Sequence, residues 1–444
     1  MGKSRRSRVP KEPVQAAIRD LSHEGRGITE VDGKTVFVAG ALPDETVTFL
    51  YRKRHRRYDD AAVQSVDQPS PKRIEPRCPH FGVCGGCSLQ HLSSDDQIAF
   101  KQEVLLDQFR RFGQVEPETV LPPLRSQPWG YRRKARLGVK NVPAKGRVLV
   151  GFREKFSPYV ADMRECHVLD PRVGFLLEPL SDLVGGLSQP DRIPQIEVSI
   201  GDNAVALVLR NLEPWAQADL ALLRDFAETH DVHLYGQPGN ETTVHPIWPE
   251  APELFYMAGD SGIRLDFRPT DFTQVNAGIN AEMLDLALGL LAPQPRERFL
   301  DLFCGLGNFT LPLARRCARV VGVEGAASLV ERARQNAAAN GTDNADFQVA
   351  DLAAEDVRQL PWLHEPFDGI LLDPPRSGAA EVLPALAALN ASRIVYVSCN
   401  PATLARDAGA LVHGYGYRLR KAGVMDMFPH TAHVESIALF ERNA

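Results

Sequence analysis

Short apolar stretches alternate with helix-like segments over the last third of the chain, and this alternation constrains the fold more than any other feature. The expected strands lie at 299–303, 319–324, 345–351, 367–373 and 393–399, and the expected helices at 309–316, 326–340, 380–388 and 401–412. Such alternation predicts a parallel sheet with helices on both faces, a doubly wound α/β domain. The segment 416–442 contains two further strands with no full helix between them and predicts an antiparallel edge pair.

Polar or reactive residues stand at the end of every one of the five expected strands, or in the loop directly after it. They are Asn308 in the loop after the first strand, then Glu324, Asp351, Asp373 and Cys399. One acidic residue after a strand is most simply a helix cap. Because the carboxyl ends of parallel strands meet at one edge, where open α/β sheets bind their ligands, five such ends predict a binding site.

The glycine loop after the first strand, DLFCGLGNFTLPLA, supplies a tight turn and close backbone approach to a ligand. Thr310 stands where a dinucleotide fingerprint has its third glycine, which disfavours a pyrophosphate. Glu324, about 20 residues on, suits the two hydroxyls of a ribose. The pattern favours a nucleoside cofactor without a pyrophosphate, for which S-adenosylmethionine is the obvious candidate, with Asp351 near the adenine amino group.

Cys399 is the candidate nucleophile. Free cysteines are more often simply buried, but Cys399 ends a strand at the binding edge, and the following Asn-Pro exposes the thiol. A thiol must ionise to react, so we expect its pKa to be lowered, with Arg376 in the neighbouring loop as the source of positive charge.

A cysteine nucleophile and a methyl sulfonium together suit methylation of carbon 5 of a pyrimidine. Thiolate addition to carbon 6 makes carbon 5 nucleophilic, and a base must later remove the carbon-5 proton so that the thiol can leave. Glu435 is the expected base, with His430 and His433 as alternatives.

The N-terminal part is basic and has the pattern of short strands. Residues 1–160 carry 29 lysines and arginines against 18 acidic residues, a net charge of +11, whereas the remainder carries −16. After a basic tail at 1–12, hairpin chemistry at Asp32-Gly33 between apolar runs indicates a small β-barrel. The basic run at 52–57, together with a second cluster at 132–140, favours a surface that follows nucleic-acid phosphates.

The middle of the chain, 71–265, is interpreted as an α+β region. It has expected helices at 95–113 and 215–230 and an antiparallel sheet formed by 135–140, 147–154, 195–201 and 203–210.

Four of the seven cysteines form a possible metal-binding set: Cys78, Cys84, Cys87 and Cys166. The spacing C-x5-C-x2-C with a distant fourth cysteine permits either zinc or an iron–sulfur cluster. The odd number of cysteines, the absence of a secretion signal and the absence of any run of about 18 apolar residues predict a soluble cytoplasmic protein with reduced thiols.

Several motifs resemble those of the uracil-C5 RNA methyltransferases, in the same order. They are DFTQVN (271–276), DLFCGLGNFTLPLA (301–314), DPPRSG (373–378), SCNP (398–401) and HVESIALF (433–440). The stretch containing GRGI and VFVAGALPDE resembles the TRAM domain, an RNA-binding barrel of the oligonucleotide-binding type. CPHFGVCGGCSLQH (78–91) resembles the cluster-binding segment of the 23S ribosomal RNA branch of that family.

The resemblance implies three domains: a TRAM barrel at 12–70, a central α+β domain with the cysteine cluster at 71–265, and a Rossmann-like methyltransferase domain at 266–444. A helical segment at about 95–124 is expected to pack on the last of these. The resemblance also implies Cys399 as nucleophile, Glu435 as base, Phe272 near the target base, and a [4Fe–4S] cluster on Cys78, Cys84, Cys87 and Cys166. The implied cofactor-side residues are Gln274, Phe303, Asn308, Glu324, Asp351 and Asp373.

The function so predicted is methyl transfer from S-adenosylmethionine to carbon 5 of a uridine in 23S ribosomal RNA by a cytoplasmic monomer without a membrane partner. The alternatives are a tRNA uracil-C5 methyltransferase, an exocyclic N-methyltransferase, to whose motif DPPR is similar, and an RNA-binding assembly factor with a vestigial cofactor site. Arg376, Ser377 and Gly378 provide no aromatic platform for an exocyclic amine, and Cys399 with Glu435 argues against a factor without activity.

Overall fold

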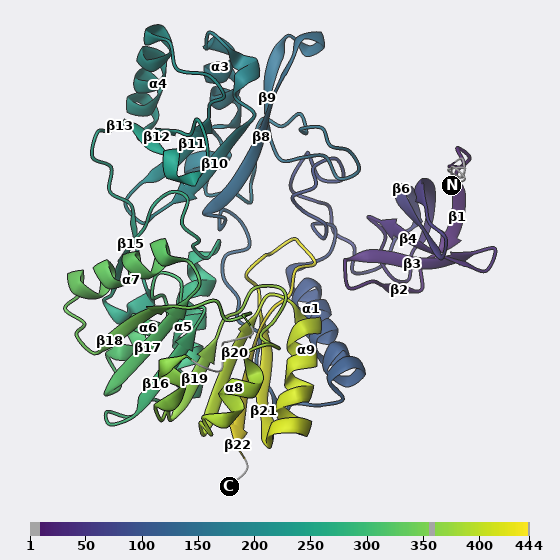
Figure 1. The fold of residues 1–444 in the computed structure, drawn as a ribbon. Helices are drawn as coiled ribbons and strands as arrows, with labels where there is room; N and C mark the ends of the chain where they lie inside the picture. Colours follow the sequence, from purple (N-terminus) through teal and green to yellow (C-terminus); the bar gives the residue numbers. More distant parts are fainter. Residues whose placement is uncertain (1–8, 355–359, 443–444) are drawn as a thin grey trace, which may run out of the picture. The chain divides into compact units, whose positions relative to one another are not determined.

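The computed structural model describes residues 9–354 and 360–442, so most of the expected basic tail lies outside the described residues (Figure 1). The chain divides into two compact units. The first consists of Met1–Phe100, Gly151–Met163 and Phe428–His433, and the second of Lys101–Val150, Arg164–Met427 and Val434–Ala444. Within the described residues, no helix is both long and apolar enough to cross a membrane.

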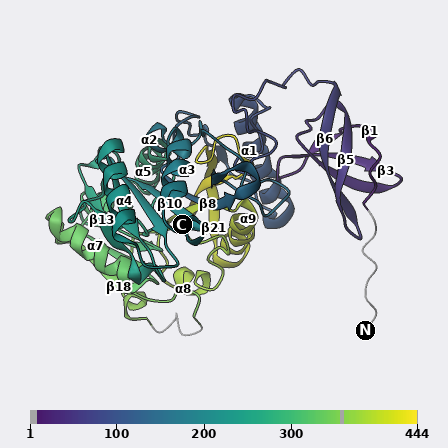
Figure 2. The same ribbon diagram turned by 90° about the horizontal axis from the view of Figure 1, so that it is seen from above.

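The first unit is built around a six-stranded sheet with the order β1-β5-β6-β4-β3-β2. Its strands are β1 (Val14–Ala17), β2 (Asp20–Leu21), β3 (Arg26–Val31), β4 (Lys34–Ala39), β5 (Thr46–Arg54) and β6 (Tyr58–Gln68). Figure 2 shows β5 and β6 side by side. The expected hairpin is confirmed, because Asp32 and Gly33 both have positive φ, at 51° and 75°, between the antiparallel strands β3 and β4.

The two ends of this N-terminal sheet approach each other. The Thr29 hydroxyl on β3 donates to the Ala17 carbonyl on β1 at 2.8 Å, and the Arg19 amide donates to the Ile28 carbonyl at 2.9 Å. One face of the sheet closes over a small apolar core made of Ile18, Val36, Val38, Ala41, Val47, Phe49 and Ala61. Burial of these side chains is the main force that curls so short a sheet.

The second unit contains a central sheet with the order β13-β12-β11-β10-β8-β9. Its strands are β8 (Lys134–Val142), β9 (Arg147–Gly151), β10 (Gln195–Ile200), β11 (Val205–Arg210), β12 (Val232–Gly236) and β13 (His245–Trp248), and its helices are α2 (Pro171–Gly174), α3 (Leu177–Gly186) and α4 (Gln217–His230). The expected sheet was entirely antiparallel, but β11 and β12 are parallel. The helix α4 crosses between these two neighbouring strands, and such a crossover returns the chain in the same direction.

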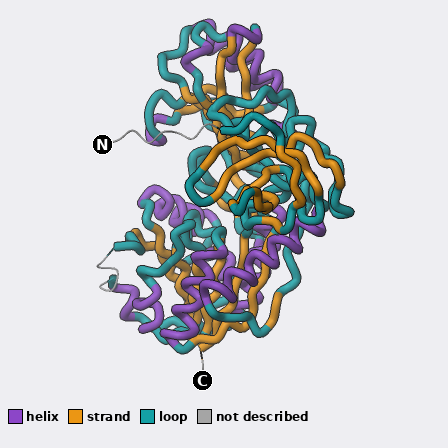
Figure 3. Tube along the Cα trace, turned by 90° about the vertical axis from the view of Figure 1, so that its right-hand side faces the viewer, coloured by secondary structure: helices purple, strands orange, loops and turns teal. Residues whose placement is uncertain are grey.

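The second unit also contains the expected doubly wound sheet, with the order β18-β17-β16-β19-β20-β22-β21-β7. Its strands are β16 (Arg298–Leu302), β17 (Arg319–Glu324), β18 (Ala345–Val349), β19 (Gly369–Leu372), β20 (Arg393–Ser398), β21 (Tyr417–Met425), β22 (Glu435–Arg442) and β7 (Thr119–Val120). Its helices are α5 (Ala277–Leu291), α6 (Thr310–Ala314), α7 (Ala327–Ala339), α8 (Leu383–Ala388) and α9 (Pro401–Gly409). The five strands from β16 to β20 are parallel, as predicted. In Figure 3 helices flank these strands on both sides.

The antiparallel pair at the C-terminus is confirmed, but it does not form the outer edge. The strand β22 lies between β20 and β21, and β7 pairs with the outer side of β21. The helix α1 (Ser94–Gln108) and the turn at Phe109–Gly113 lead into β7, and Figure 1 shows α1 beside α9. An added Cβ on Gly113 would lie 2.6 Å from the Ala405 carbonyl oxygen, so only glycine permits this approach to α9.

One apolar cluster joins the central sheet to the glycine loop of the doubly wound sheet. It consists of Ala206, Val208, Tyr235, Leu254, Phe267 and Leu306, around the short hairpin β14 (Phe255–Met257) and β15 (Arg264–Asp266). Leu306 belongs to the glycine loop, so side chains of the central sheet pack against this loop and help to hold it in place.

Candidate functional site

The glycine loop follows β16 in a strained backbone conformation. Phe303, Gly305 and Gly307 have positive φ, at 64°, 54° and 93°. A hydrogen bond from the Phe303 amide to the Val323 carbonyl, at 2.8 Å, offsets part of the strain of this conformation. The Cys304 amide also donates to the Val323 carbonyl, at 3.1 Å, so hydrogen bonds to β17 hold the loop at the carboxyl edge of the sheet.

Glu324 and Asp351 end or follow the next two strands, β17 and β18. The Glu324 carboxylate accepts from the Gly305 amide at 3.2 Å and from the Ala326 amide at 3.0 Å. The Asp351 carboxylate accepts from the Ala353 amide at 2.9 Å and is exposed. Both residues lie at the predicted edge, Glu324 joined to the glycine loop and Asp351 capping its own turn.

Asn308 is placed at the same edge, but its side chain is occupied by two neighbours that the sequence analysis missed. Asn308 and Asn280 exchange two amide hydrogen bonds, at 2.9 and 3.1 Å, and the Tyr256 hydroxyl donates to the Asn308 oxygen at 3.1 Å. Asn280 lies on α5 and Tyr256 on β14, and no spacing in the sequence relates them to the loop. The Asn308 side chain therefore fixes the loop to α5.

Two carboxyl groups with raised pKa values lie at this edge, Asp301 fully buried and Asp373 half-buried. Asp373 follows β19, and burial raises its pKa to about 7. Asp301 on β16, which the sequence analysis did not single out, also has its pKa raised to about 7, chiefly by burial, although the Thr310 hydroxyl donates to it at 2.5 Å. Burial therefore favours the protonated form of both carboxyl groups.

Cys399 lies between the end of β20 and the start of α9. Asn400 caps α9, because its side-chain oxygen accepts from the Ala402 amide at 3.1 Å, and its amide nitrogen donates to the Arg376 carbonyl at 2.9 Å. The cap therefore holds the thiol beside the loop that contains Asp373 and Arg376. The thiol is partly exposed, as the Asn-Pro sequence predicted.

Glu435 is the first residue of β22 and is almost fully buried. In the antiparallel register between β20 and β22 the last pair is Ser398 and Ser436, so Cys399 and Glu435 are the residues directly beyond this pair on the two strands. Burial, and then the charge of Asp373, raises the pKa of Glu435 well above its usual range, while Arg376 acts in the opposite direction.

The expectation of a lowered thiol pKa is wrong for the protein without ligands. Burial raises the pKa of Cys399, the carboxylates of Glu435 and Asp373 raise it further, and Arg376 lowers it only in part. The sequence showed the arginine, but it did not show that two carboxyl groups face the same thiol.

Gln274 and Phe272 lie in the loop before α5. The Lys134 ammonium holds this loop by donating to the carbonyls of Pro269 and Asp271, at 2.7 and 2.6 Å. Phe272 is 66% exposed, and Gln274 is partly buried. The second basic cluster is thus partly internal, since Lys134 holds a loop and Arg133 pairs with Asp202.

The first unit holds three of the four candidate metal ligands, in a tight loop. The Cys84 amide donates to the His80 carbonyl at 2.9 Å, and the Gly86 amide lies 3.3 Å from the Cys84 sulfur, with which it makes a hydrogen bond. The neighbouring segment pairs with this loop through the Gly85 amide and the Arg153 carbonyl at 2.8 Å. An added Cβ on Gly85 would lie 3.0 Å from that carbonyl oxygen, which explains the glycine.

Cys166, the fourth candidate, is buried in the second unit, where its amide donates to the Gly174 carbonyl at 2.8 Å. The candidate bases His430 and His433 belong to the first unit. Within residues 9–354 and 360–442, no group of three or more histidine, cysteine or acidic side chains is arranged to hold a metal ion.

The basic run of the N-terminal sheet lies on the outer part of β5 and the turn after it. Arg52, Lys53, Arg54, Arg56 and Arg57 are all exposed. Arg54 is paired with the buried Asp59, at 3.4 Å, and the Arg52 guanidinium lies 5.6 Å from the centre of the Phe156 ring. Most of this positive charge remains available to a ligand in solution.

A doubly wound sheet with a glycine loop, carboxylates and a thiol at its carboxyl edge defines a group-transfer enzyme of the Rossmann-like class. The family model described as tRNA (Uracil-5-)-methyltransferase matches residues 256–443. The chain is 61% identical over 445 residues to the 23S rRNA (uracil(1939)-C(5))-methyltransferase RlmD of Alkalilimnicola ehrlichii, covering 100% of both chains. It is 52% identical to the protein of the same name from Methylococcus capsulatus, covering 99% of both. The chain therefore belongs to the uracil-C5 RNA methyltransferase family, in its RlmD branch.

A solved structure supports the same assignment. The Pyrococcus abyssi tRNA (uracil-54, C5)-methyltransferase in complex with S-adenosyl-L-homocysteine superposes with a TM-score of 0.74 at 25% identity, covering 96% of this chain and 100% of that one. The similarity extends over both units of the chain and is not confined to the doubly wound sheet.

Proposed function

We propose that the protein transfers a methyl group from S-adenosylmethionine to carbon 5 of a uridine in 23S ribosomal RNA. The observation that carries the proposal is the proximity of Cys399 and Glu435, which flank the last residue pair of β20 and β22 and interact electrostatically, at the ligand-binding edge of the doubly wound sheet. The full-length similarity to RlmD proteins gives the substrate class.

Cys399 acts as the nucleophile. Its thiolate adds to carbon 6 of the uracil ring, forming a carbon–sulfur bond and moving the electron pair of the carbon 5–carbon 6 double bond toward carbon 5 and the carbonyl oxygen at position 4. Carbon 5 becomes nucleophilic as a result. Arg376 supports this step, because its positive charge stabilises the thiolate against the neighbouring carboxylates.

Glu435 acts as the base. After carbon 5 has gained the methyl group, Glu435 removes its proton, the double bond forms again, and the thiolate leaves carbon 6. A buried carboxylate with a raised pKa is a stronger base than an exposed one, which suits proton removal from carbon.

The residues present fit S-adenosylmethionine. Glu324 is bound to the glycine loop and offers carboxylate oxygens where a ribose would lie, and Asp351 follows the next strand. We assign Gln274, Phe303, Asn308, Glu324, Asp351 and Asp373 to the cofactor side, with Asn308 acting through the loop that it anchors. When bound, the cofactor supplies an electrophilic methyl group on a sulfonium. Phe272, exposed before α5, is placed to contact the target base.

A mechanism-based trap tests this proposal. Ribosomal RNA containing 5-fluorouridine is expected to form a covalent adduct with the protein in the presence of the cofactor, because fluorine cannot leave carbon 5 as a cation. The Cys399→Ala variant should form none, whereas Cys317→Ser, a change at a cysteine remote from the binding edge, should behave like the wild type. Methyl transfer to normal RNA without any trapped adduct would show that the thiol mechanism is wrong.

A second comparison decides between the two RNA classes. The protein is incubated with protein-free 23S ribosomal RNA and, separately, with unmodified tRNA, and the 5-methyluridine formed is counted by mass spectrometry of nucleosides. Methylation of tRNA alone would assign the activity of the Pyrococcus relative and not that of the RlmD proteins.

We also propose that residues 12–70 form a TRAM barrel that binds the RNA. The curled sheet with its ends hydrogen bonded and the exposed basic run on β5 support the proposal. Residues 71–265 and 266–444 are proposed as the central and methyltransferase domains, and the protein as a cytoplasmic monomer, which sedimentation analysis can check.

Cys78, Cys84, Cys87 and Cys166 are further proposed to bind a [4Fe–4S] cluster. The Gly86 amide directed at the Cys84 sulfur supports thiolate ligation, because such hydrogen bonds stabilise the negative charge on sulfur. A cluster binds each thiolate to a different iron atom, so its ligands are spread more widely than those of one zinc ion. Anaerobic purification should give a brown protein that absorbs near about 400 nm. Loss of the colour in Cys84→Ser and Cys166→Ser but not in Cys317→Ser is expected, and one equivalent of zinc in place of iron would contradict the proposal.

A further inference from the structure

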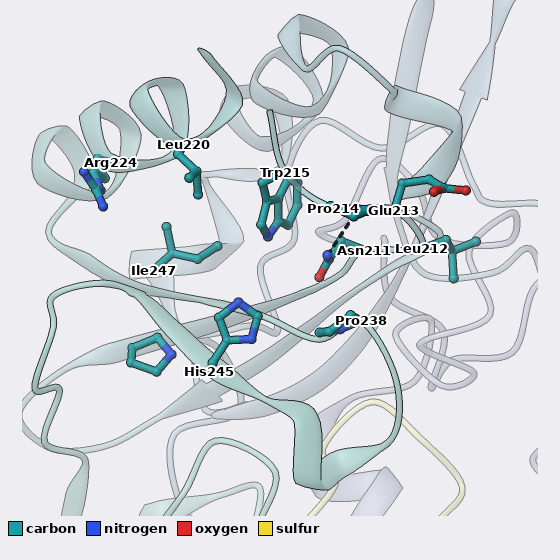
Figure 4. A pocket seen from close by; sticks show the side chains of 11 residues that line it. Asn211, Leu212, Glu213, Pro214, Trp215, Leu220, Arg224, Pro238, His245 and Ile247 are labelled. Atoms are coloured by element: carbon teal, nitrogen blue, oxygen red, sulfur yellow. Dashed lines mark hydrogen bonds between the residues drawn. The ribbon is translucent and has the colours of Figure 1, made fainter. Parts of the chain in front are cut away.

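A pocket of about 540 Å³ lies in the central sheet of the second unit, between the start of α4 and the strands β12 and β13. Figure 4 shows Trp215 above the pocket, His245 below it, and Leu220 and Ile247 toward the side of α4. Most of the lining is apolar or aromatic, which is typical of a site for a flat organic ligand.

The walls of this pocket are held firmly in place. The Asp219 carboxylate accepts from the Ala216 amide at 3.2 Å and from the Ser188 hydroxyl at 2.6 Å, which fixes the residue directly after Trp215. The Asn211 amide group donates to the Glu213 carbonyl at 3.0 Å and fixes the turn before it. The pocket is therefore formed before any ligand arrives.

Two buried polar atoms beside the pocket have no hydrogen-bond partner. They are the indole nitrogen of Trp215 and the side-chain oxygen of Asn211, a residue that is only 2% exposed. In Figure 4 both atoms point toward the space above His245 and Pro238. A buried donor and a buried acceptor left unpaired are each destabilising, so the pair indicates a ligand that offers one acceptor and one donor.

Gly236 on β12 keeps this space open. An added Cβ there would lie 3.0 Å from both the Trp215 indole nitrogen and the nearest His245 ring nitrogen, Nε2. The other ring nitrogen of His245 lies 3.1 Å from the Thr243 carbonyl and donates to it, so Nε2 is the acceptor of the neutral ring. Donor and acceptor atoms thus converge where a side chain is missing.

An unpaired cation lies at one end of the same pocket. Arg224 is exposed on α4 and makes no hydrogen bond or ion pair with any described residue. Glu213, at the other end, is already paired with Arg192 at 3.8 Å. The free charge of the pocket is therefore positive, which favours a ligand with an anionic group attached to its flat part.

We propose that this pocket binds one unpaired nucleotide of the ribosomal RNA other than the target uridine. Its base lies against the Trp215 ring, the base edge meets the indole nitrogen and the Asn211 oxygen, and a phosphate lies at Arg224. The inference rests on the proposed function and deepens it, because it adds a second point of recognition outside the methyl-transfer site.

The fluorescence of Trp215 tests the binding directly. Trp215 is one of four tryptophans, so the difference between wild type and Trp215→Phe isolates its emission. A 23S ribosomal RNA fragment is expected to quench this difference signal, since a stacked base quenches indole emission. Uridine and adenosine monophosphates at the same nucleotide concentration should not. Equal quenching by the mononucleotides would identify a free-nucleotide site and overturn the assignment to RNA.

Methylation kinetics on the same fragment give the second readout. Trp215→Ala and Arg224→Gln should each raise the KM for RNA about 10-fold, as expected for the loss of one stacked base or one phosphate contact, with kcat little changed. Arg316→Gln, which removes the same charge at the opposite, amino-terminal edge of the doubly wound sheet, should leave KM unchanged. Unchanged KM in both pocket variants, with no quenching, would overturn the proposal.

Two outcomes separate this inference from the proposed function. Quenching by ribosomal RNA without any methyl transfer by the wild type would contradict the proposed function and support nucleotide binding in the pocket. Normal methylation by the wild type together with unaffected pocket variants would support the proposed function and contradict binding in the pocket. If Trp215→Ala fails to fold, as judged by thermal unfolding, Trp215→Phe and Arg224→Gln still decide the question.

Discussion

Cys399 directly follows β20 and Glu435 is the first residue of β22, so the two residues flank the last pair of the antiparallel register between these strands, Ser398 and Ser436. This hydrogen-bonded ladder places the two side chains at the same end of the strands, although 36 positions separate them in the sequence. A slip of one residue in this ladder would turn Glu435 to the opposite face of the sheet. The register itself is thus part of the proposed active site.

Replacement of the base should separate the two halves of the reaction. In Glu435→Gln, thiolate addition and methyl transfer remain possible, but removal of the carbon-5 proton is slowed. We expect a covalent complex between protein and methylated RNA to accumulate on denaturing gels, with turnover reduced at least 100-fold. Glu441→Gln on the same strand serves as the control. A Glu435→Gln variant with normal turnover and no complex would exclude this carboxylate as the base.

The reactivity of the thiol should depend on the two charged neighbours in opposite directions. Burial and Glu435 raise the pKa of Cys399, and Arg376 lowers it. Because the thiolate is the reactive form, alkylation of Cys399 by iodoacetamide in the free protein should increase with pH. Glu435→Gln should shift the profile to lower pH and Arg376→Gln to higher pH. Shifts of the same sign in both variants would contradict the assigned geometry.

Asp373 should destabilise the free protein at alkaline pH. Burial raises its pKa to about 7 in the folded state, so the folded protein binds a proton that the unfolded chain releases at about pH 4. The cost of ionising Asp373 is absent below about pH 4, grows between about pH 4 and pH 7, and levels off above pH 7 at an upper bound of about 4 kcal/mol.

The variant Asp373→Asn should therefore unfold at a higher temperature than the wild type at about pH 8 and at a similar temperature at about pH 4. Calorimetry at the two pH values measures the difference. The same variant should bind the cofactor more weakly, because a carboxylate of the binding edge is lost. A stabilisation that is equal at both pH values would mean that the ionisation of Asp373 is not its cause.

The ion pair between Lys101 and Asp426 should be costly to break from one side. Lys101 is fully buried, and its ammonium donates to Asp426 at 2.7 Å. Lys101→Met leaves a buried carboxylate without its partner, and we expect a loss of about 3–5 kcal/mol in the free energy of unfolding, measured with urea. Adding Asp426→Leu should recover most of the loss. Glu103→Gln on the same helix, which removes an exposed ion pair with Arg110, should change stability by less than about 1 kcal/mol.

The basic run on β5 should determine the salt dependence of RNA binding. Arg52 and Lys53 are exposed, and neutralising both is expected to lower the slope of log Kd against log salt by roughly 1 to 2 and to weaken binding at low salt. Fluorescence anisotropy with labelled RNA gives the slope. Arg316→Gln serves as the control. Substitutions of Arg133 and Lys134 are unsuitable as controls, because these two residues make internal contacts with Asp202 and the Pro269 carbonyl. An unchanged slope would place RNA binding elsewhere.

The sequence predicted the doubly wound sheet and its binding edge well, because each depends on local patterns. Strand β17 was predicted at its observed bounds, and Glu324, Asp373 and Cys399 follow their strands as expected. Asp32 and Gly33 likewise determine their hairpin through their own backbone preferences.

The remaining features depend on contacts between distant segments, which have no local pattern. Burial, and then carboxyl groups that come from a distant strand and loop, raise the pKa of Cys399, and so the expected direction was wrong. The network of Asn308, Asn280 and Tyr256 joins three elements. The strand β7 is only two residues long and therefore too short to predict from sequence. It forms because its residues pair with the outer side of β21.

The division of the chain into two units has a consequence for its synthesis. The chain passes between the units five times, and the last segment of the first unit is Phe428–His433. A ribosome must therefore translate nearly the whole protein before the N-terminal unit possesses all its parts. Neither unit can be released as a single proteolytic fragment, and folding that follows the direction of translation cannot finish the first unit before the second has begun.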